Sequence, residues 1–433
     1  MATAPARPYG FGLSTVIKVE IMKPRAFLGK LLLALFGIVS SLLLLEVAAR
    51  LLVPPRRTPL DAYYTADERG YTIHRRNLNA MIPEPETNTP VLVQTNREGF
   101  VGRDYTIDHP TSTLRLAFLG DSFTEALQVD VTSTFAALLE RDLNARSPQI
   151  NFEVMNFAVG SQGTGEELLR YQQYVRKYRP DVVVYFFFPN DFENNQYYLK
   201  YRDRFLSSNP ADWQDIPEAQ ANLNAGRRDL KFRLLQTSRL AQVVDRRVRE
   251  VPWLADLAVR AGLHDRGVMG ASQNGVHPTF FIFHNPLPEA HRTVYKFTRQ
   301  LLQQAAERAV ADGSAFVVAY LPQAEQVDHG LWSALQQELP ALREPGWDLR
   351  LPNSWLAEQA KEGQWPLVDL TPAFAGHYRQ ASTTPLYNWR GQYFNGHLNV
   401  RGHQLVAQEL VKFFTDYLQR SGIITRHFQN ITK

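Results

Sequence analysis

The stretch Leu114–Gly120 has the sequence LRLAFLG and is followed directly by Asp121-Ser122-Phe123-Thr124. A short apolar run that ends in glycine predicts a buried strand, and the polar residues after it predict a turn into a helix. Ser122 would then lie at the carboxyl end of a central strand, where an α/β sheet presents its ligands. Backbone N–H groups at such a helix start can stabilise a developing oxyanion. Taken alone, however, Gly-Asp-Ser is better explained as a turn with Asp or Ser as the helix cap.

Strands and helices alternate on both sides of this stretch. The β-branched and aromatic run DVVVYFFF at 181–188 predicts the strongest strand of the chain. The alternation breaks near Asn194 and resumes after a charged region with helical spacing over 230–261. We therefore expect one α/β domain, a parallel sheet covered by helices on both faces, with a helical insertion. The other expected strands are 152–156, 315–320 and 365–370, and the expected helices are 134–143, 165–178, 292–311 and 402–418.

Composition excludes several classes of protein. Of the 433 residues, 44% are hydrophobic and 21% are charged, which is ordinary for a globular chain and excludes a wholly disordered one. The chain has no cysteine, which excludes disulfides, a catalytic thiol and a thiolate zinc site. Net charge is +4, but residues 1–57 carry +6, so the rest of the chain carries −2. A near-neutral main body argues against a nucleic-acid partner.

The basic N-terminal residues flank an apolar run. Residues 31–45, LLLALFGIVSSLLLL, contain no charge, and the apolar segment extends far enough on both sides to span a bilayer. Pro54-Pro55 then ends the helix. A cleaved signal peptide is the alternative, but Val47-Ala48-Ala49 is a poor cleavage site. We expect a single-pass anchor in the cell inner membrane, with the main domain on the periplasmic or extracytoplasmic side. An arginine-rich helix face in the insertion can contact lipid headgroups, although a solvated face is the simpler reading.

These observations divide the chain into seven expected parts. The expected parts are a basic segment (1–25), the transmembrane anchor (26–53), a tether with an irregular N-terminal extension (54–112), the first half of the α/β domain (113–199), the helical insertion (200–290), the second half of the domain (291–420) and a C-terminal tail (421–433).

Polar residues end each of the central strands. Asn156 and the loop after it end the second strand, and Pro189-Asn190-Asp191 ends the third. Asn395-Gly396-His397 precedes the last helix. Carboxyl ends of parallel strands meet at one edge of a sheet, so we expect these side chains to meet Ser122 there. Ser, Asn and His together supply a nucleophile, an oxyanion donor and a general base.

This set of blocks, in this order, resembles the SGNH (GDSL-type) hydrolase family over about 113–193 and 291–418. The resemblance implies a three-layer α/β/α sandwich with a flavodoxin-like parallel sheet. It also implies residue roles: Ser122 as nucleophile, Asn190 as a side-chain oxyanion donor, and His397 as the base that deprotonates Ser122 and then activates water.

The chain departs from the family at two positions. The family's oxyanion glycine falls on Ser161 here, with Gly160 one residue early; a backbone N–H from Ser161 can serve if its backbone angles are tolerated. The family places an Asp two or three residues before the catalytic His, where this chain has Asn395 and Phe394. Replacing the triad Asp by Asn in a serine protease lowers turnover by about 10⁴-fold. The chain is therefore a Ser–His dyad, uses another acid, or has only slight activity. Asp369 is the nearest candidate by topology, although a cap before Thr371 explains it more simply.

Other residues give weaker signals. Asp121 is expected to be a structural cap, Glu125 is a secondary candidate for a substrate contact, and His403 is expected at a helix start outside the catalytic set. The histidines show no metal-binding spacing, so we expect no metal and no cofactor.

The sequence thus favours a membrane-anchored serine esterase that cleaves an O-acyl group from a glycan or lipid through an acyl-Ser122 intermediate. Two alternatives stay open. One is an O-acyltransferase component working with a multi-span membrane acyltransferase, and the other is a non-catalytic SGNH-like subunit of a membrane complex.

Overall fold

The computed structural model describes most of the chain. The described residues are 24–52, 62–84, 86–207, 209–213, 216, 238–250, 254, 257, 274–380, 384–388 and 396–424.

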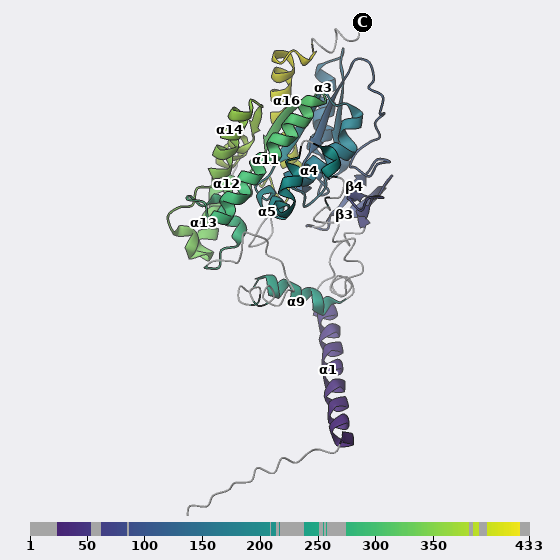
Figure 1. The fold of residues 1–433 in the computed structure, drawn as a ribbon, viewed down its shortest axis with the longest axis vertical. Coiled ribbons are helices and arrows are strands. Elements are labelled where there is room, and N and C mark those ends of the chain that lie inside the picture. Colours follow the sequence, from purple (N-terminus) through teal and green to yellow (C-terminus); the bar gives the residue numbers. More distant parts are fainter. Residues whose placement is uncertain are drawn as a thin grey trace, which may run out of the picture.

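A five-stranded parallel sheet forms the centre of the α/β body (Figure 1). Its strand order is β6-β5-β7-β8-β9. The first strand of this sheet in chain order, β5, therefore lies between the second, β6, and the third, β7. This is the flavodoxin-like doubly wound order, and it confirms the predicted fold class. The strands are β5 (Thr113–Leu119), β6 (Asn151–Asn156), β7 (Val182–Phe187), β8 (Ala315–Tyr320) and β9 (Leu367–Asp369).

Side chains alternate between two buried cores, one on each face of the sheet. In β7, Val183, Tyr185 and Phe187 enter one core, while Val184 and Phe186 enter the other. Such continuous apolar strands are expected where helices cover both faces. The first core is closed by α4 (Thr164–Arg170), α5 (Asp191–Gln196), α6 (Arg202–Phe205), α11 (Glu289–Ala311), α13 (His329–Glu338) and α14 (Leu351–Gly363). The second is closed by α3 (Phe135–Arg146), α12 (Ala324–Val327), α15 (Thr371–Gln380) and α16 (Val400–Arg420).

Short turns complete these layers. The expected helix at 165–178 is α4 continued by other helical turns, because the chain changes to a π-helical turn after Arg170. The π turn is Tyr171–Val175, and the 3₁₀ turns are Val131–Ser133, Arg176–Tyr178, Leu199–Tyr201, Pro210–Trp213, Pro278–Phe283 and Pro340–Arg343.

The N-terminal extension is more regular than expected. It was predicted to be irregular, but it forms two antiparallel hairpins, β1 (Tyr64–Ala66) with β2 (Thr72–His74), and β3 (Asn79–Pro83) with β4 (Pro90–Gln94). The reason is that buried and more exposed side chains alternate along the short strands. In β4, Val91 and Val93 are buried while Leu92 is only half-buried. A small core around Tyr63 and Val93 also includes Leu127 and Val131 of the α/β body, so the extension packs against it.

Among the described residues, helices α1 and α9 lie outside the α/β body. Helix α1 (Pro24–Leu52) contains a 21-residue apolar stretch, Leu32–Leu52, that by length and composition suits a membrane anchor or a signal sequence. Helix α9 (Arg239–Glu250) belongs to the expected insertion and lies across the end of α1 (Figure 1).

Candidate active site

The turn after β5 presents Ser122 at the edge of the sheet. Ser122 is the first residue of α2 (Ser122–Glu125), and Asp121 caps that short helix by accepting from the Phe123 N–H at 2.9 Å. Asp121 and Phe123 are buried, whereas Ser122 is partly exposed. The strand order reverses between β5 and β7, which is where doubly wound sheets open a crevice for ligands. Ser122 therefore lies at a place suited to a nucleophile.

His397 faces Ser122 from the loop before α16. Its Nε2 lies 2.7 Å from the Ser122 Oγ, and its ring lies against the Phe123 ring with 4.7 Å between centroids. The loop is fixed because the His397 carbonyl oxygen accepts from the Asn388 N–H, and Asn399 caps α16. The predicted pairing of Ser122 with His397 is thus present as geometry, within hydrogen-bond reach for proton transfer.

The other ring nitrogen of His397 contacts an acid that the sequence analysis missed. Its Nδ1 lies 2.5 Å from Glu86 Oε1, and its backbone N–H also donates to the Glu86 carboxylate at 3.0 Å. Glu86 lies in the loop of the β3–β4 hairpin. The buried Glu84 organises this loop by accepting from the backbone N–H groups of Glu86 and Thr87. Ser122, His397 and Glu86 therefore form a Ser–His–acid chain.

Asp369, the acid candidate from the sequence, lies in a different environment. It accepts hydrogen bonds from the Asn353 amide at 3.1 and 3.2 Å and from the Thr371 N–H at 2.9 Å. These are the contacts of a residue that caps α15, which was the simpler explanation of Asp369 from the sequence. In this structure Glu86, and not Asp369, lies on the Nδ1 side of His397.

Charges around His397 favour its protonated form. Burial alone would lower the pKa of His397, but the hydrogen bond that its ring donates to Glu86 and the charge of Glu86, together with Asp121 and Glu125, raise it above the ordinary histidine value. Burial also raises the pKa of Asp121 to about 6, against the lowering effect of the Asn190 amide and the Phe123 N–H. A raised histidine pKa is what a base needs if it is to hold the serine proton.

Asn190 reaches the same crevice from the end of β7. Its Nδ2 donates to Asp121 Oδ2 at 2.9 Å, so the predicted oxyanion donor is fixed by the residue beside the nucleophile. An amide nitrogen carries two hydrogens, and this contact uses one of them. The second can be directed at an oxyanion near Ser122.

Ser161 adopts the backbone conformation that glycine favours. Its φ is 60°, in the left-handed region, and its side chain is exposed. The neighbouring Gly160 N–H is already used, since it donates to Glu125 Oε1 at 2.9 Å. The chain thus tolerates serine at the family's glycine position, and Ser161 is the residue of this loop to consider as the backbone donor.

A family comparison agrees with this geometry. The model of the GDSL-like lipase/acylhydrolase family matches residues 116–410, about two thirds of the chain. The chain belongs to this family. No curated protein matches this GDSL-like acylhydrolase in sequence.

Solved structures give distant likenesses. The acetyl xylan esterase AlAXEase is 15% identical, with 69% of this chain and 98% of that chain covered at a TM-score of 0.36. TesA is 12% identical, with 69% and 97% covered at a TM-score of 0.33. A catalytic mutant of the acetylxylan esterase Axe2 from Geobacillus stearothermophilus is 11% identical, with 70% and 95% covered at 0.36.

Behind the nucleophile, this GDSL-like chain buries a second polar cluster around Glu125. The Glu125 carboxylate accepts from Tyr64 at 2.8 Å and from the Gly160 N–H, and it lies 2.7 Å from His74 Nε2. His74 Nδ1 faces the Gly99 carbonyl oxygen, so both ring nitrogens face oxygen atoms. Burial, and then the charge of Glu125, raise the pKa of Tyr64 well above its ordinary value, so Tyr64 stays a donor. The cluster ties the extension to α2 and to the Gly160 loop.

The remaining residues singled out in the sequence are placed as follows. Burial, and then the charge of His397, lower the pKa of His403 to about 3, so its neutral ring accepts from the Phe135 N–H. His403 therefore has a structural contact outside the triad. Asn395 and Phe394 lie outside the described residues. Within the described part of the chain, no group of three acidic or histidine side chains is arranged to hold a metal.

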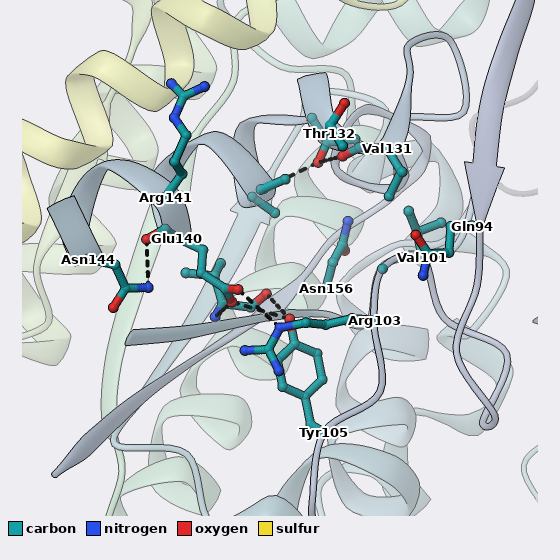
Figure 2. Close-up of a pocket in the computed structure, with 15 residues that line it drawn as sticks. Gln94, Val101, Arg103, Tyr105, Val131, Thr132, Glu140, Arg141, Asn144 and Asn156 are labelled. Atoms are coloured by element: carbon teal, nitrogen blue, oxygen red, sulfur yellow. Dashed lines mark hydrogen bonds and ion pairs between the residues drawn. The ribbon is translucent and has the colours of Figure 1, made fainter. Parts of the chain in front are cut away.

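A hollow of about 290 Å³ lies beside the site, between α3, β6 and the segment after β4 (Figure 2). Arg103 lies over the Tyr105 ring at 4.2 Å and donates to Glu140 at 3.1 Å, so these side chains satisfy one another. Asn156 forms part of the wall, and its amide donates to the Thr124 carbonyl oxygen of α2 at 2.7 Å. The hollow thus adjoins the helix that carries Ser122, without being lined by the triad.

Proposed function

We propose that this chain is a membrane-anchored serine esterase of the GDSL-like family that cleaves O-acyl esters outside the cytoplasm. The observation that carries the proposal is the continuous chain Ser122 Oγ, His397, Glu86, with 2.7 and 2.5 Å between successive partners. A histidine held between a serine and a carboxylate is the arrangement that activates serine for acyl transfer.

The mechanism follows from this arrangement. His397 Nε2 takes the proton of Ser122 as Oγ attacks the ester carbonyl carbon, and Glu86 stabilises the imidazolium that forms. The Asn190 amide and the backbone N–H of Ser161 stabilise the negative oxygen of the tetrahedral intermediate. His397 then protonates the leaving alcohol, and in the second half it deprotonates the water that releases the acid from acyl-Ser122.

The acid at Glu86 also bears on the alternatives. The missing acid before His397 was an argument for a non-catalytic subunit, and Glu86 weakens that argument because it contacts His397 from another part of the chain. Nothing among the described residues distinguishes transfer to an acceptor from transfer to water. For the substrate we propose an acyl ester on a glycan or lipid, as in the sequence analysis.

Labelling of Ser122 tests the proposal most directly. A fluorophosphonate probe should label the full chain, and Ser122→Ala should abolish both labelling and the hydrolysis of short p-nitrophenyl esters. His397→Ala, with the nucleophile intact, should reduce both rates. A Ser122 that resists the probe in a folded protein, together with no ester hydrolysis, would show that the chain is not a serine esterase.

A further inference from the structure

Helix α9 is attached to α1 through the acidic residue Glu46. The Glu46 carboxylate accepts from the N–H groups of Arg239 and Leu240, each at 3.0 Å, and from the Ser238 hydroxyl at 2.7 Å. Ser238 in turn accepts from the Ala241 N–H at 3.0 Å, as a helix N-cap does. One side chain of α1 therefore binds the amino-terminal end of α9, where the helix dipole favours a negative charge.

The position of Glu46 along α1 sets the depth of this contact relative to a bilayer. It is the first charged residue after the uncharged run 31–45. About 20 helical residues cross the hydrocarbon core of a bilayer, and α1 is longer than that. If its residues 26–45 fill the core, Glu46 and the turns after it lie at the level of the headgroups. If α1 is the anchor, α9 begins at the level of the lipid headgroups and runs across α1 rather than along it (Figure 1).

The sequence of α9 suits that level. Leu240, Val244 and Val248 recur every four residues and share one face, and Val244 is 51% exposed. The helix contains four arginines against one aspartate and one glutamate. Short helices with an apolar face and an excess of basic residues lie in the interface of anionic membranes.

We propose that α9 is an interfacial helix that binds anionic phospholipid headgroups and lays its apolar face into the bilayer surface. This inference rests on the proposed membrane anchor. It replaces the solvated helix face that the sequence alone favoured, because the contact with Glu46 ties α9 to the level of the bilayer surface. The partner is identified by charge complementarity between the basic helix and the headgroups.

Because the chain has no cysteine, a single introduced cysteine can be labelled selectively in the full chain. Val244→Cys carries an environment-sensitive thiol probe in α9, and Val310→Cys, which is also exposed but lies at the end of α11, is the matched control. Both proteins are reconstituted in vesicles of phosphatidylcholine alone or mixed with phosphatidylglycerol. We expect a blue-shifted emission and loss of quenching by aqueous iodide at position 244 only, and more strongly with phosphatidylglycerol.

Other results would overturn the assignment. Equal iodide quenching at positions 244 and 310 would place α9 in water, and equal emission in the two vesicle types would remove the role of anionic headgroups. A disulfide between two Val244→Cys chains on mild oxidation would identify a second copy as the occupant. Extraction of the full chain from vesicles by high salt would contradict the anchor instead.

Glu46 gives a second, independent arm of the test. Glu46→Gln in the Val244→Cys background should shift the emission back toward that of water, because the amide is a weaker partner for the α9 N–H groups than the carboxylate. Glu409→Gln, which removes a partly exposed carboxylate beside Lys412, is the control and should leave the emission unchanged. Unchanged emission in Glu46→Gln would show that Glu46 does not hold α9.

Discussion

His397 receives its acid from a residue 311 positions earlier in the chain. In the family that the sequence resembles, the acid lies two or three residues before the histidine on the same loop. Here Glu86 reaches both the ring Nδ1 and the backbone N–H of His397, so one carboxylate orients the ring and fixes the loop. A carboxylate in this position selects the tautomer with Nε2 directed at Ser122 and stabilises the imidazolium.

Glu86→Gln should lower kcat by about 10⁴-fold, as loss of the triad acid does in a serine protease. The pH profile should move as well. Activity requires neutral His397, so the rate falls as pH drops through its pKa, which Glu86 holds above the ordinary value. Removing the carboxylate lowers that pKa, so the acid limb should move to lower pH. Measuring kcat/KM for a short ester against pH tests both effects.

The corresponding control is Asp369→Asn. Asp369 contacts Asn353 and Thr371, so this change should weaken the cap of α15 while leaving the pH profile of the remaining activity unchanged. Loss of activity in Asp369→Asn, with wild-type behaviour in Glu86→Gln, would assign the acid role to Asp369 after all.

Ser161 makes a separate prediction, because its φ of 60° is costly for a residue with a side chain. Ser161→Gly should keep kcat and stabilise the fold by up to about 1 kcal/mol. Ser161→Val should destabilise it by about 1–2 kcal/mol and lower kcat, since a β-branched residue resists this conformation and displaces the amide. Thermal unfolding and ester kinetics measure the two effects. A Ser161→Gly enzyme that folds but is inactive would show that the hydroxyl, rather than the N–H, is required.

At the scale of elements, the hairpin β3–β4 supplies the missing part of the site. The sequence predicted the five sheet strands to within two residues at each end, because each is a compact apolar run bounded by polar residues. It also placed Ser122 and His397 on one edge, because the carboxyl ends of parallel strands meet there.

The role of Glu86 could not be predicted from the sequence in this way. The segment PETNTP before the VLVQ strand carries a turn signal, and the alternation of valines was visible, but nothing local relates a hairpin loop to a histidine 311 residues away. Several acids in 54–112 were equivalent from sequence alone. Only the packing of the extension on the α/β body selects one of them.

The hairpin β1–β2 is joined to α2 by the buried pair of His74 and Glu125. Removing one partner leaves the other buried without its hydrogen bond, so Glu125→Gln and His74→Gln should each destabilise the fold by about 1–3 kcal/mol. The double variant should lose less than the sum of the two, and denaturant unfolding of all four proteins measures the difference. Additive losses would show that the two side chains act independently. Glu125→Gln should also lower kcat. The Glu125 carboxylate accepts from the Gly160 N–H and so helps to position the loop that contains Ser161.

Over the whole molecule, the edge of the sheet that carries the site is directed toward α9 and α1. In Figure 1, α5 and the β3–β4 hairpin lie on the side of the α/β body nearer α9, whereas the C-terminal end of the chain lies at the opposite end. Asn190 precedes α5 and Glu86 lies in that hairpin, so the proposed catalytic groups belong to the side that faces α9 and α1. If α1 is the proposed anchor, this orientation favours an ester presented near the membrane surface.

Removal of residues 1–53 tests that orientation. It deletes α1 and most of the excess positive charge, and the α/β body should remain folded because its two cores contain no residue of α1. Turnover of a soluble p-nitrophenyl ester should be unchanged, whereas turnover of an acyl ester embedded in vesicles should fall, because the site is no longer held at the surface. Loss of Glu46 also uncaps α9, so any residual vesicle binding should be weak and should disappear at high salt. Equal turnover of the embedded ester by the full and shortened chains would contradict a surface-directed site, and binding that survives high salt would require a second attachment outside α1.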